Sequence, residues 1–368
     1  MASFDEVLKD CTKLGTKIPT SEYLESGKYP IIDQGQNDIA GYYDSDDGLF
    51  EDVPTIVFGD HTRVVKYVDK PCFLGADGVK LLCPLDKDIN CKYLFYQLSC
   101  ADIPNTGYNR HFKWVKALDF KIPSSDEQNH VVEVLDKVTE LISLRKQQLF
   151  KLDELVKARF VEMFGDPADN VNNLPASPMT AICQIIDGDR GKNYPKQEEF
   201  SDSGFCLFLN AKNVTAQGFS FENCTYITEE KDALLRNGKL CRGDVVLTTR
   251  GTIGNLAFYD TSVPYENIRI NSGMVILRMN KQVVSEIFFI EQFKMQLDSI
   301  KSRIASGSAQ PQLPISTMNK IEMILPPIEL QNQFAAFVER VSQQKQTVQQ
   351  SLEKLELMKK ALMQEYFG

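Results

Sequence analysis

Two stretches of the chain carry apolar residues at alternating spacings of three and four. They span 121–165 and 323–368, and each runs without Gly or Pro from its last proline, Pro123 or Pro327, to a terminal glycine. Residues at this spacing form one stripe along a helix, and a sustained stripe is typical of coiled coils. We therefore predict two long helices whose packing surfaces contain Leu135, Val138, Leu149, Leu152, Val338, Val341, Leu352 and Leu355.

The two helical stretches are copies of each other. Offset by 203 positions, Gln128-Asn129 falls on Gln331-Asn332, and the ungapped register ends with Phe164-Gly165 on Phe367-Gly368. Identities that persist over such a length indicate an internal duplication. The whole chain is therefore predicted to consist of two copies of one plan.

Charged residues interrupt the apolar stripe at different places in the two copies. Arg145 corresponds to Val348, and Ile142 corresponds to Lys345. Such an exchange suits helices that pack on each other and on a partner with different faces. It equally suits positions at the edge of the stripe, where long side chains extend to solvent.

The segments before the two helices, 1–120 and 179–322, have a different pattern. They are rich in Gly, Asn and Asp and contain short β-type runs such as 54–58 and 244–248, interrupted by helical patterns at 91–100 and 284–302. This mixture predicts two α+β globular domains. The join at 166–178, with three prolines and several Asn, is interpreted as a linker.

Composition limits the classes of protein that remain. The 368 residues exceed one ordinary domain, and 41 Lys and Arg against 50 Asp and Glu give a net charge of −9. The whole-chain charge therefore gives no support to a nucleic-acid partner. Neither a signal peptide nor a membrane span is apparent, which favours a cytoplasmic protein. Nine scattered cysteines without a C-x-x-C pair are interpreted as reduced thiols that mostly pack.

Motifs for catalysis are missing from the sequence. Gly188-Asp189-Arg190-Gly191-Lys192 lacks the spacing of a phosphate-binding loop, and Arg250-Gly251-Thr252-Ile253-Gly254 is better explained as a turn at a strand end. The three histidines lie far apart, with no acidic or cysteine cluster at ligand spacing. We expect no catalytic residue, no metal site and no bound cofactor in this chain.

Binding signals lie instead in polar loops at comparable places in both copies. Residues 108–116 mix cations, amides and aromatics, and 301–312 is free of acids. Arg, Asn and Gln can read base edges, whereas Lys holds phosphates. Ordinary solvated turns would have the same composition. The residues predicted to contact DNA are Arg63, Asn109, Arg110, His111 and Lys113 in the first copy, and Arg190, Lys192, Arg250, Arg303, Gln310 and Gln312 in the second.

Taken together, these segments resemble the specificity subunit of type I restriction-modification systems. The resemblance rests on Tyr29-Pro30-Ile31-Ile32, on Phe58-Gly59-Asp60-His61-Thr62-Arg63, on Gly243-Asp244-Val245-Val246-Leu247 and on the twin proline-to-Gln helix starts closed by Phe-Gly. It covers nearly the whole chain. The second globular part is longer than the first, so individual loops need not correspond.

The resemblance implies a non-enzymatic DNA reader. In that family two target-recognition domains each bind one half of an interrupted double-stranded DNA site. The helices pack antiparallel, separate the domains and dock two adenine methyltransferase subunits. S-adenosylmethionine, ATP and Mg²⁺ belong to partner subunits; whether a translocating nuclease is one of the partners here is left open by the sequence. The alternative interpretation is a coiled-coil scaffolding protein whose globular domains bind other proteins. An enzyme-linked variant, in which one partner fuses nuclease and methylase, also remains open.

Overall fold

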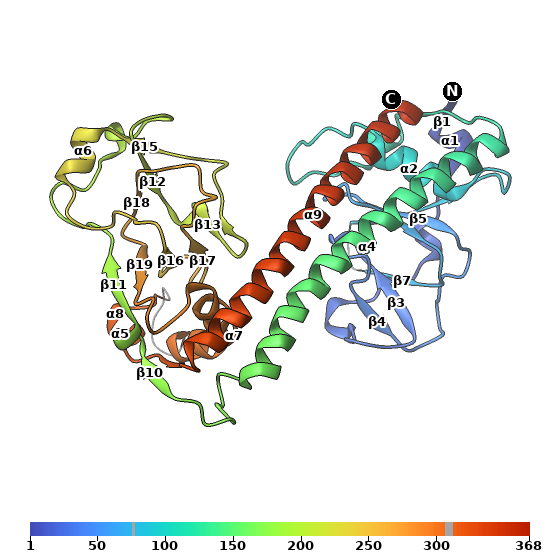
Figure 1. Ribbon diagram of the computed structural model, residues 1–368. Helices are drawn as coiled ribbons and strands as arrows, with labels where there is room; N and C mark the ends of the chain where they lie inside the picture. Colours follow the sequence, from blue (N-terminus) through green and yellow to red (C-terminus); the bar gives the residue numbers. More distant parts are fainter. Residues whose placement is uncertain (76–77, 306–311) are drawn as a thin grey trace. The chain divides into compact units, whose positions relative to one another are not determined.

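The computed structural model describes residues 1–75, 78–305 and 312–368, with the side chains of 303–305 left aside. The chain divides into two compact units, unit 1 (1–148 and 348–368) and unit 2 (149–347). Two helices of 40 residues each, α4 (Ser125–Phe164) and α9 (Ile328–Phe367), are the longest elements (Figure 1). Each helix begins in one unit and ends in the other.

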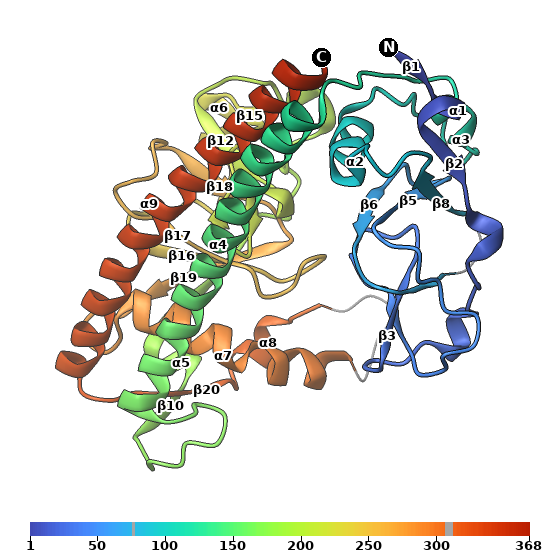
Figure 2. The same cartoon turned by 90° about the vertical axis from the view of Figure 1, so that its right-hand side faces the viewer.

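Unit 1 is built on two small sheets. The first has four antiparallel strands in the order β2-β8-β5-β6 (Figure 2). In the second, β3 pairs antiparallel with β4 and parallel with β7. The elements of this unit are β1 (Ala2–Ser3), α1 (Phe4–Val7), β2 (Leu8–Asp10), β3 (Tyr29–Ile32), β4 (Gly41–Tyr43), β5 (Thr55–Gly59), β6 (Val65–Val68), β7 (Phe73–Leu74), β8 (Val79–Pro84), α2 (Cys91–Cys100), α3 (Phe112–Val115) and β9 (Asp119–Phe120), which pairs with β1.

Unit 2 repeats this topology. Its four-stranded sheet has the order β11-β19-β16-β17, and its second sheet again joins one antiparallel and one parallel neighbour to a central strand, β12. A hairpin, β13-β14, and helix α6 are additional. The elements are β10 (Ala176–Pro178), α5 (Met179–Ile182), β11 (Cys183–Asp187), β12 (Cys206–Leu209), β13 (Val214–Thr215), β14 (Gly218–Phe219), β15 (Tyr226–Ile227), α6 (Glu229–Leu234), β16 (Asp244–Thr248), β17 (Leu256–Phe258), β18 (Ile268–Ile270), β19 (Met274–Met279), α7 (Glu286–Ala305), α8 (Ile315–Met318) and β20 (Glu322–Ile324). The predicted α+β class and the internal repeat are confirmed.

The expected linker at 166–178 is too long by three residues. Ala176–Pro178 forms β10, which pairs antiparallel with β20, and the amide of Leu325 extends the pairing by donating to the carbonyl of Pro175 at 2.6 Å. The prolines suggested a loop because they cannot donate to a ladder. They are tolerated here because β10 has only one neighbouring strand, β20.

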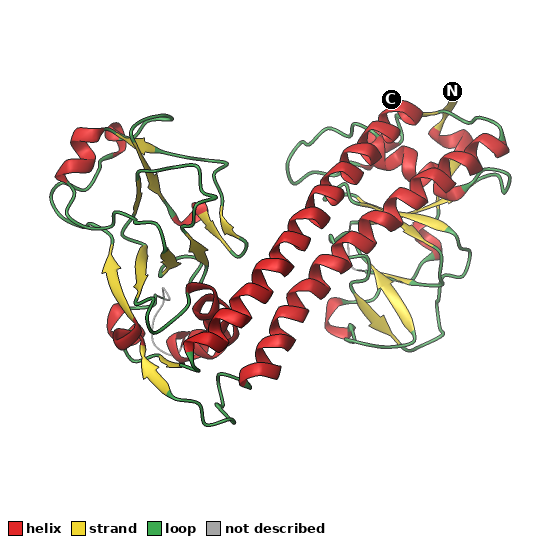
Figure 3. Cartoon of the chain, in the orientation of Figure 1, coloured by secondary structure: helices red, strands yellow, loops and turns green. Residues whose placement is uncertain are grey.

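The long helices, drawn red in Figure 3, run antiparallel where they meet in each unit. In unit 1 the Arg145 guanidinium donates to the Ser351 hydroxyl at 3.2 Å, and Lys146 forms an ion pair with Glu356. In unit 2 Lys345 pairs with Asp153, so residue numbers rise along one helix as they fall along the other. Arg145 thus extends to a polar partner at the edge of the apolar stripe, as one of the two sequence interpretations requires.

The predicted packing residues serve two kinds of contact. Leu135 is fully buried in the core of unit 1, and Val338 and Val341 belong to the core of unit 2, against which Leu152 also packs. The other predicted residues are Val138 and Leu352, which are buried, and Leu149 and Leu355, which are half-buried. The apolar stripe therefore holds helices to globular cores as well as to each other.

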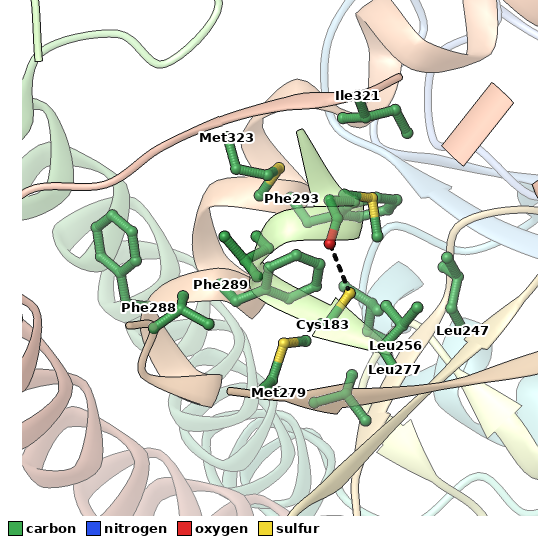
Figure 4. Close-up of a cluster of buried hydrophobic side chains, with 14 of the residues drawn as sticks. Cys183, Leu247, Leu256, Leu277, Met279, Phe288, Phe289, Phe293, Ile321 and Met323 are labelled. Atoms are coloured by element: carbon green, nitrogen blue, oxygen red, sulfur yellow. Dashed lines mark hydrogen bonds between the residues drawn. The ribbon is translucent and has the colours of Figure 1, made fainter. Parts of the chain in front are cut away.

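The repeated Phe-Gly ends lie against aromatic residues. In unit 2 the Phe164 ring packs against Phe288 and Phe334 at centroid distances of 5.1 and 5.7 Å. Figure 4 shows Phe288 beside Phe289 and other side chains of this core. In unit 1 the Phe367 ring contacts Tyr93 of α2 at 5.2 Å. Each long helix therefore ends by contributing an aromatic ring to a core that it did not start in.

The repeated glutamine near each helix start is buried and makes the same bonds in both units. The Gln128 side chain accepts from the amide of Asn90, the N-cap of α2, and donates to the Pro123 carbonyl, both at 2.9 Å. The Gln331 side chain accepts from the amide of Ser285, directly before α7, at 3.0 Å and donates to the Pro326 carbonyl at 2.8 Å. Each glutamine thus joins a long helix to the helix of its globular domain.

Replacing Gln331 by Leu should destabilise the protein. The Ser285 amide and the Pro326 carbonyl would stay buried without their partner, which costs about 1–3 kcal/mol. Chemical denaturation followed by circular dichroism measures the loss. Gln344→Leu, at an exposed position of the same helix, is the control and should change stability by less than about 0.5 kcal/mol. Equal stabilities for the two variants would contradict this role.

Candidate nucleic-acid interface

Both units bring the same two loops together. One is the hairpin turn that follows β5 in unit 1 and β16 in unit 2, and the other precedes the short helix α3 or α8. The His111 amide donates to the Asp60 carbonyl at 2.8 Å, and the Leu313 amide donates to the Thr249 carbonyl at 3.0 Å. We call these the paired loops: residues 59–64 with 104–111 in unit 1, and 249–255 with 312–314 in unit 2. The predicted DNA contacts fall mostly on or beside them.

A buried His and Asp hold the paired loops of unit 1 together. His111 is fully buried, with Nδ1 2.9 Å from the Asp60 carbonyl and Nε2 3.3 Å from the Thr106 hydroxyl. The Asp60 carboxylate accepts from the Phe112 amide at 2.7 Å. The prediction that His111 contacts DNA is therefore wrong in this structure, because both ring nitrogens are engaged inside the loop. Its role is to position the residues around it.

Arg63 also has a positioning contact. Its backbone adopts the left-handed conformation with φ at 62°, and its half-buried guanidinium donates to the Ile103 carbonyl at 3.1 Å. The contact joins the hairpin turn to the start of the second loop. Asn109, Arg110 and Lys113 are exposed as predicted residues of a DNA-facing loop must be, and whether they touch DNA stays a prediction.

Two aromatic residues in the paired loops of unit 1 are absent from the predicted DNA contacts. The His61 and Tyr108 rings stack with their centroids 4.7 Å apart and their planes 9° from parallel. Tyr108 is 87% exposed, and His61 Nδ1 lies 3.2 Å from the Asn109 carbonyl. Exposed planar rings provide stacking surfaces for nucleic-acid bases. The available signal was an aromatic residue within a polar, cationic loop.

The paired loops of unit 2 bring together three of the predicted residues. Arg190, Arg250 and Gln312 line one pocket of about 240 Å³. Arg250 and Gln312 form a β-bridge, and both are exposed. The Arg190 guanidinium donates to the Asp187 carboxylate at 3.1 Å and to the Ser272 carbonyl at 3.2 Å, so it is fixed in the wall of the pocket.

A buried carboxylate shapes the loop that carries Arg190 and Lys192. Burial would raise the pKa of Asp189, but the amides of Gly191 and Arg236, each donating at 2.7 Å, hold the pKa of this carboxyl below its ordinary value. Asp189 therefore stays charged and keeps the loop folded on itself. Lys192 is exposed on the same loop. Of the remaining candidates, Gln310 lies outside the described residues, and for Arg303 only the backbone, within α7, is described.

The described part of the chain also bears on metal, thiol and membrane chemistry. No group of three or more His, Cys, Asp and Glu there could hold a metal ion. The nine cysteines are free, and burial raises the pKa of Cys72, Cys91 and Cys183 to about 12, so these thiols stay neutral. Among the helices of the described residues, none combines the length and apolar character that a bilayer crossing needs.

The sequence matches the family described as the type I restriction modification DNA specificity domain over residues 5–154 and 179–357. The chain belongs to this family. The two matched ranges cover most of both globular domains and of both long helices. The family resemblance seen in the sequence is thereby confirmed.

Individual relatives are more distant. The specificity subunit of the type I restriction enzyme EcoR124I/EcoR124II from Escherichia coli is 23% identical over 151 residues, which are 36% of this chain and 37% of that protein. The match therefore spans little more than a third of that relative. The S subunit of a type I restriction-modification system from M. genitalium has the same fold, with a TM-score of 0.58 and 18% identity over 100% of this chain and 95% of that one.

A second solved structure also shares the fold. Its description names the structural basis underlying complex assembly and conformational transition of the type I R-M system. Its chain gives a TM-score of 0.55 at 14% identity. The likeness covers 98% of this chain and 94% of that one. The fold is thus shared along nearly the whole length of both solved chains.

Substitutions at neighbouring positions should separate positioning from contact. His111→Ala removes a buried ring with bonds at both nitrogens and should lower stability by about 1–3 kcal/mol. Arg110→Ala, at an exposed position, should change it by less than about 0.5 kcal/mol. Urea denaturation of both variants measures the difference. If His111→Ala unfolds at the wild-type urea concentration, the ring is not what holds these loops.

Proposed function

We propose that this chain is the DNA-binding specificity subunit of a type I restriction-modification complex. Each unit reads one half of an interrupted double-stranded site through its paired loops. The observation that carries the proposal is their duplication: the same backbone bond joins the same two loops in both units, and exposed cationic, amide or aromatic side chains surround it. Family membership supports this function over the scaffolding alternative.

The loops suit readout because the scaffold fixes them. In unit 1 the turn follows β5, which is buried along its whole length, and in unit 2 it follows the equally buried β16. Side chains mounted on rigid strand ends lose little freedom when they bind, so the binding energy goes into discrimination between bases. Direct readout in the major groove needs such fixed donors and acceptors.

The two long helices suit the spacing of half-sites. A helix of 40 residues is roughly 60 Å long at the usual rise per residue. Two half-sites must lie at a set distance and helical phase along the duplex if one protein is to read both. We propose that the antiparallel helices provide this spacing and also dock two methyltransferase subunits.

The net charge of −9 sets a condition on DNA binding. Phosphate contacts supply much of the affinity of DNA-binding proteins, and an acidic chain offers few of them. We infer that the isolated chain binds DNA weakly and with strong salt dependence, and that partner subunits close the complex with positive surface. S-adenosylmethionine, ATP and Mg²⁺ are expected on those partners, whereas this chain carries no catalytic step.

Co-expression with the methyltransferase subunit encoded beside this chain, in a host without DNA methylation, tests the function. We expect adenine methylation, mapped across the host genome, to define a motif of two short specific parts separated by a fixed unspecified gap. Reading by two units joined through helices requires this form. A purified complex that assembles but leaves the genome unmethylated would contradict the proposal and favour the scaffolding alternative.

The helix packing surface should control assembly. Leu352 is 6% exposed on α9, and Leu352→Asp would bury a charge there, so binding of the methyltransferase subunits should fall below detection in a pull-down. Gln350→Asp, at an exposed position two residues away, is the matched control and should assemble normally. Circular dichroism of both variants checks that they fold. Normal assembly of Leu352→Asp would refute the coiled-coil packing as a condition for assembly.

A further inference from the structure

The two units present different residues at equivalent positions of their paired loops. The bond that joins the loops runs from His111 to Asp60 in unit 1 and from Leu313 to Thr249 in unit 2. The residue after the accepting carbonyl is therefore His61 in one unit and Arg250 in the other. The residue before the donating amide is Arg110 in one and Gln312 in the other. The two units share the backbone bond, but the side chains beside it differ.

In unit 2 the paired loops carry an arginine, Arg250, whose side chain does not hold the loops together. The Arg250 side chain is exposed and has no hydrogen-bond or ion-pair partner among the described residues, although its amide donates to the Gly273 carbonyl and so fixes the backbone. Arg190, in the wall of the same pocket, is held instead by Asp187 and Ser272. An arginine on a fixed backbone with a free guanidinium is ready to bind an external acceptor.

The chemistry of the two bridged side chains selects their ligands. A guanidinium donates two parallel hydrogen bonds, and guanine is the base that presents two acceptors, O6 and N7, in the major groove. The amide of glutamine both donates and accepts, which matches N7 and N6 of adenine. Directly bridged residues lie roughly 5 Å apart, close enough to reach neighbouring base pairs at about 3.4 Å rise.

We propose that Arg250 reads a guanine in the half-site bound by unit 2, and that Gln312 reads the adjacent base pair, with adenine as its preferred base. This inference rests on the proposed function. It also implies that the half-sites differ, because unit 1 has the stacked His61 and Tyr108 rings where unit 2 has Arg250. The rival role for Arg250 is a phosphate contact, which would favour no particular base.

Two substitutions distinguish base readout from phosphate binding. Arg250→Lys keeps the charge but loses the two-pronged donor, and Arg250→Ala loses both. Each full-length variant is co-expressed with the methyltransferase subunit in the methylation-free host, and methylated adenines are mapped. We expect both variants to accept other bases at one G·C position of one half-site. Discrimination at that position should fall roughly 5- to 150-fold, with the other half-site unchanged.

Gln312→Ala should relax the neighbouring position only. Arg110→Ala, at the residue before the donating amide of unit 1, is the control and should leave the half-site of unit 2 intact. The inference is overturned if Arg250→Lys keeps the full wild-type motif, if the relaxed position is not a G·C pair, or if methylation falls equally at all sequences. Should the wild-type chain itself give no bipartite motif, the proposed function fails instead, so the two failures are distinguishable.

Discussion

Each long helix must satisfy two hydrophobic cores at once. Leu135, near the start of α4, is buried in unit 1, whereas Phe160 and Phe164, at its end, are buried in unit 2. In helix α9 the order is reversed: Phe334, near its start, is buried in unit 2, and Phe367, at its end, packs against the core of unit 1. The apolar residues near the two ends of each helix therefore belong to different cores.

The spacing of apolar residues was sufficient to predict the helices and the main strands, because it depends only on residues close together in the sequence. The duplication was visible as identities at a fixed offset. Neither pattern was sufficient for His111. A histidine in a polar loop is indistinguishable in sequence from its exposed neighbours, and its burial depends on Asp60, which lies 51 positions away. The repeated glutamines were visible as a motif, but their bonds to Asn90 and Ser285 connect segments that only the fold brings together.

The paired loops of the two units share one backbone bond but carry different side chains beside it. Asp60 and Thr249 accept the same type of backbone bond, yet the residues beside them are His61 and Arg250. In unit 1 the attachment is strengthened by buried polar side chains, and in unit 2 the Thr249 hydroxyl donates to the Gly273 carbonyl at 3.0 Å. Because the attachment is made by backbone groups and buried side chains, exposed residues can change without loss of the loop geometry. The residues that hold the loops and the exposed residues beside them therefore cannot be told apart from the sequence alone.

Unit 1 is built from two separate parts of the chain, which affects how the protein folds during translation. This unit contains residues 1–148 but also 348–368, and Phe367 packs on Tyr93. The ribosome releases the amino-terminal part of unit 1 long before residues 348–368 have been synthesised. Unit 2, which lies within 149–347, can complete its core first. The nascent amino-terminal part of unit 1 must meanwhile expose the apolar surface that α9 covers in the folded chain, and transiently exposed surface of this kind favours aggregation.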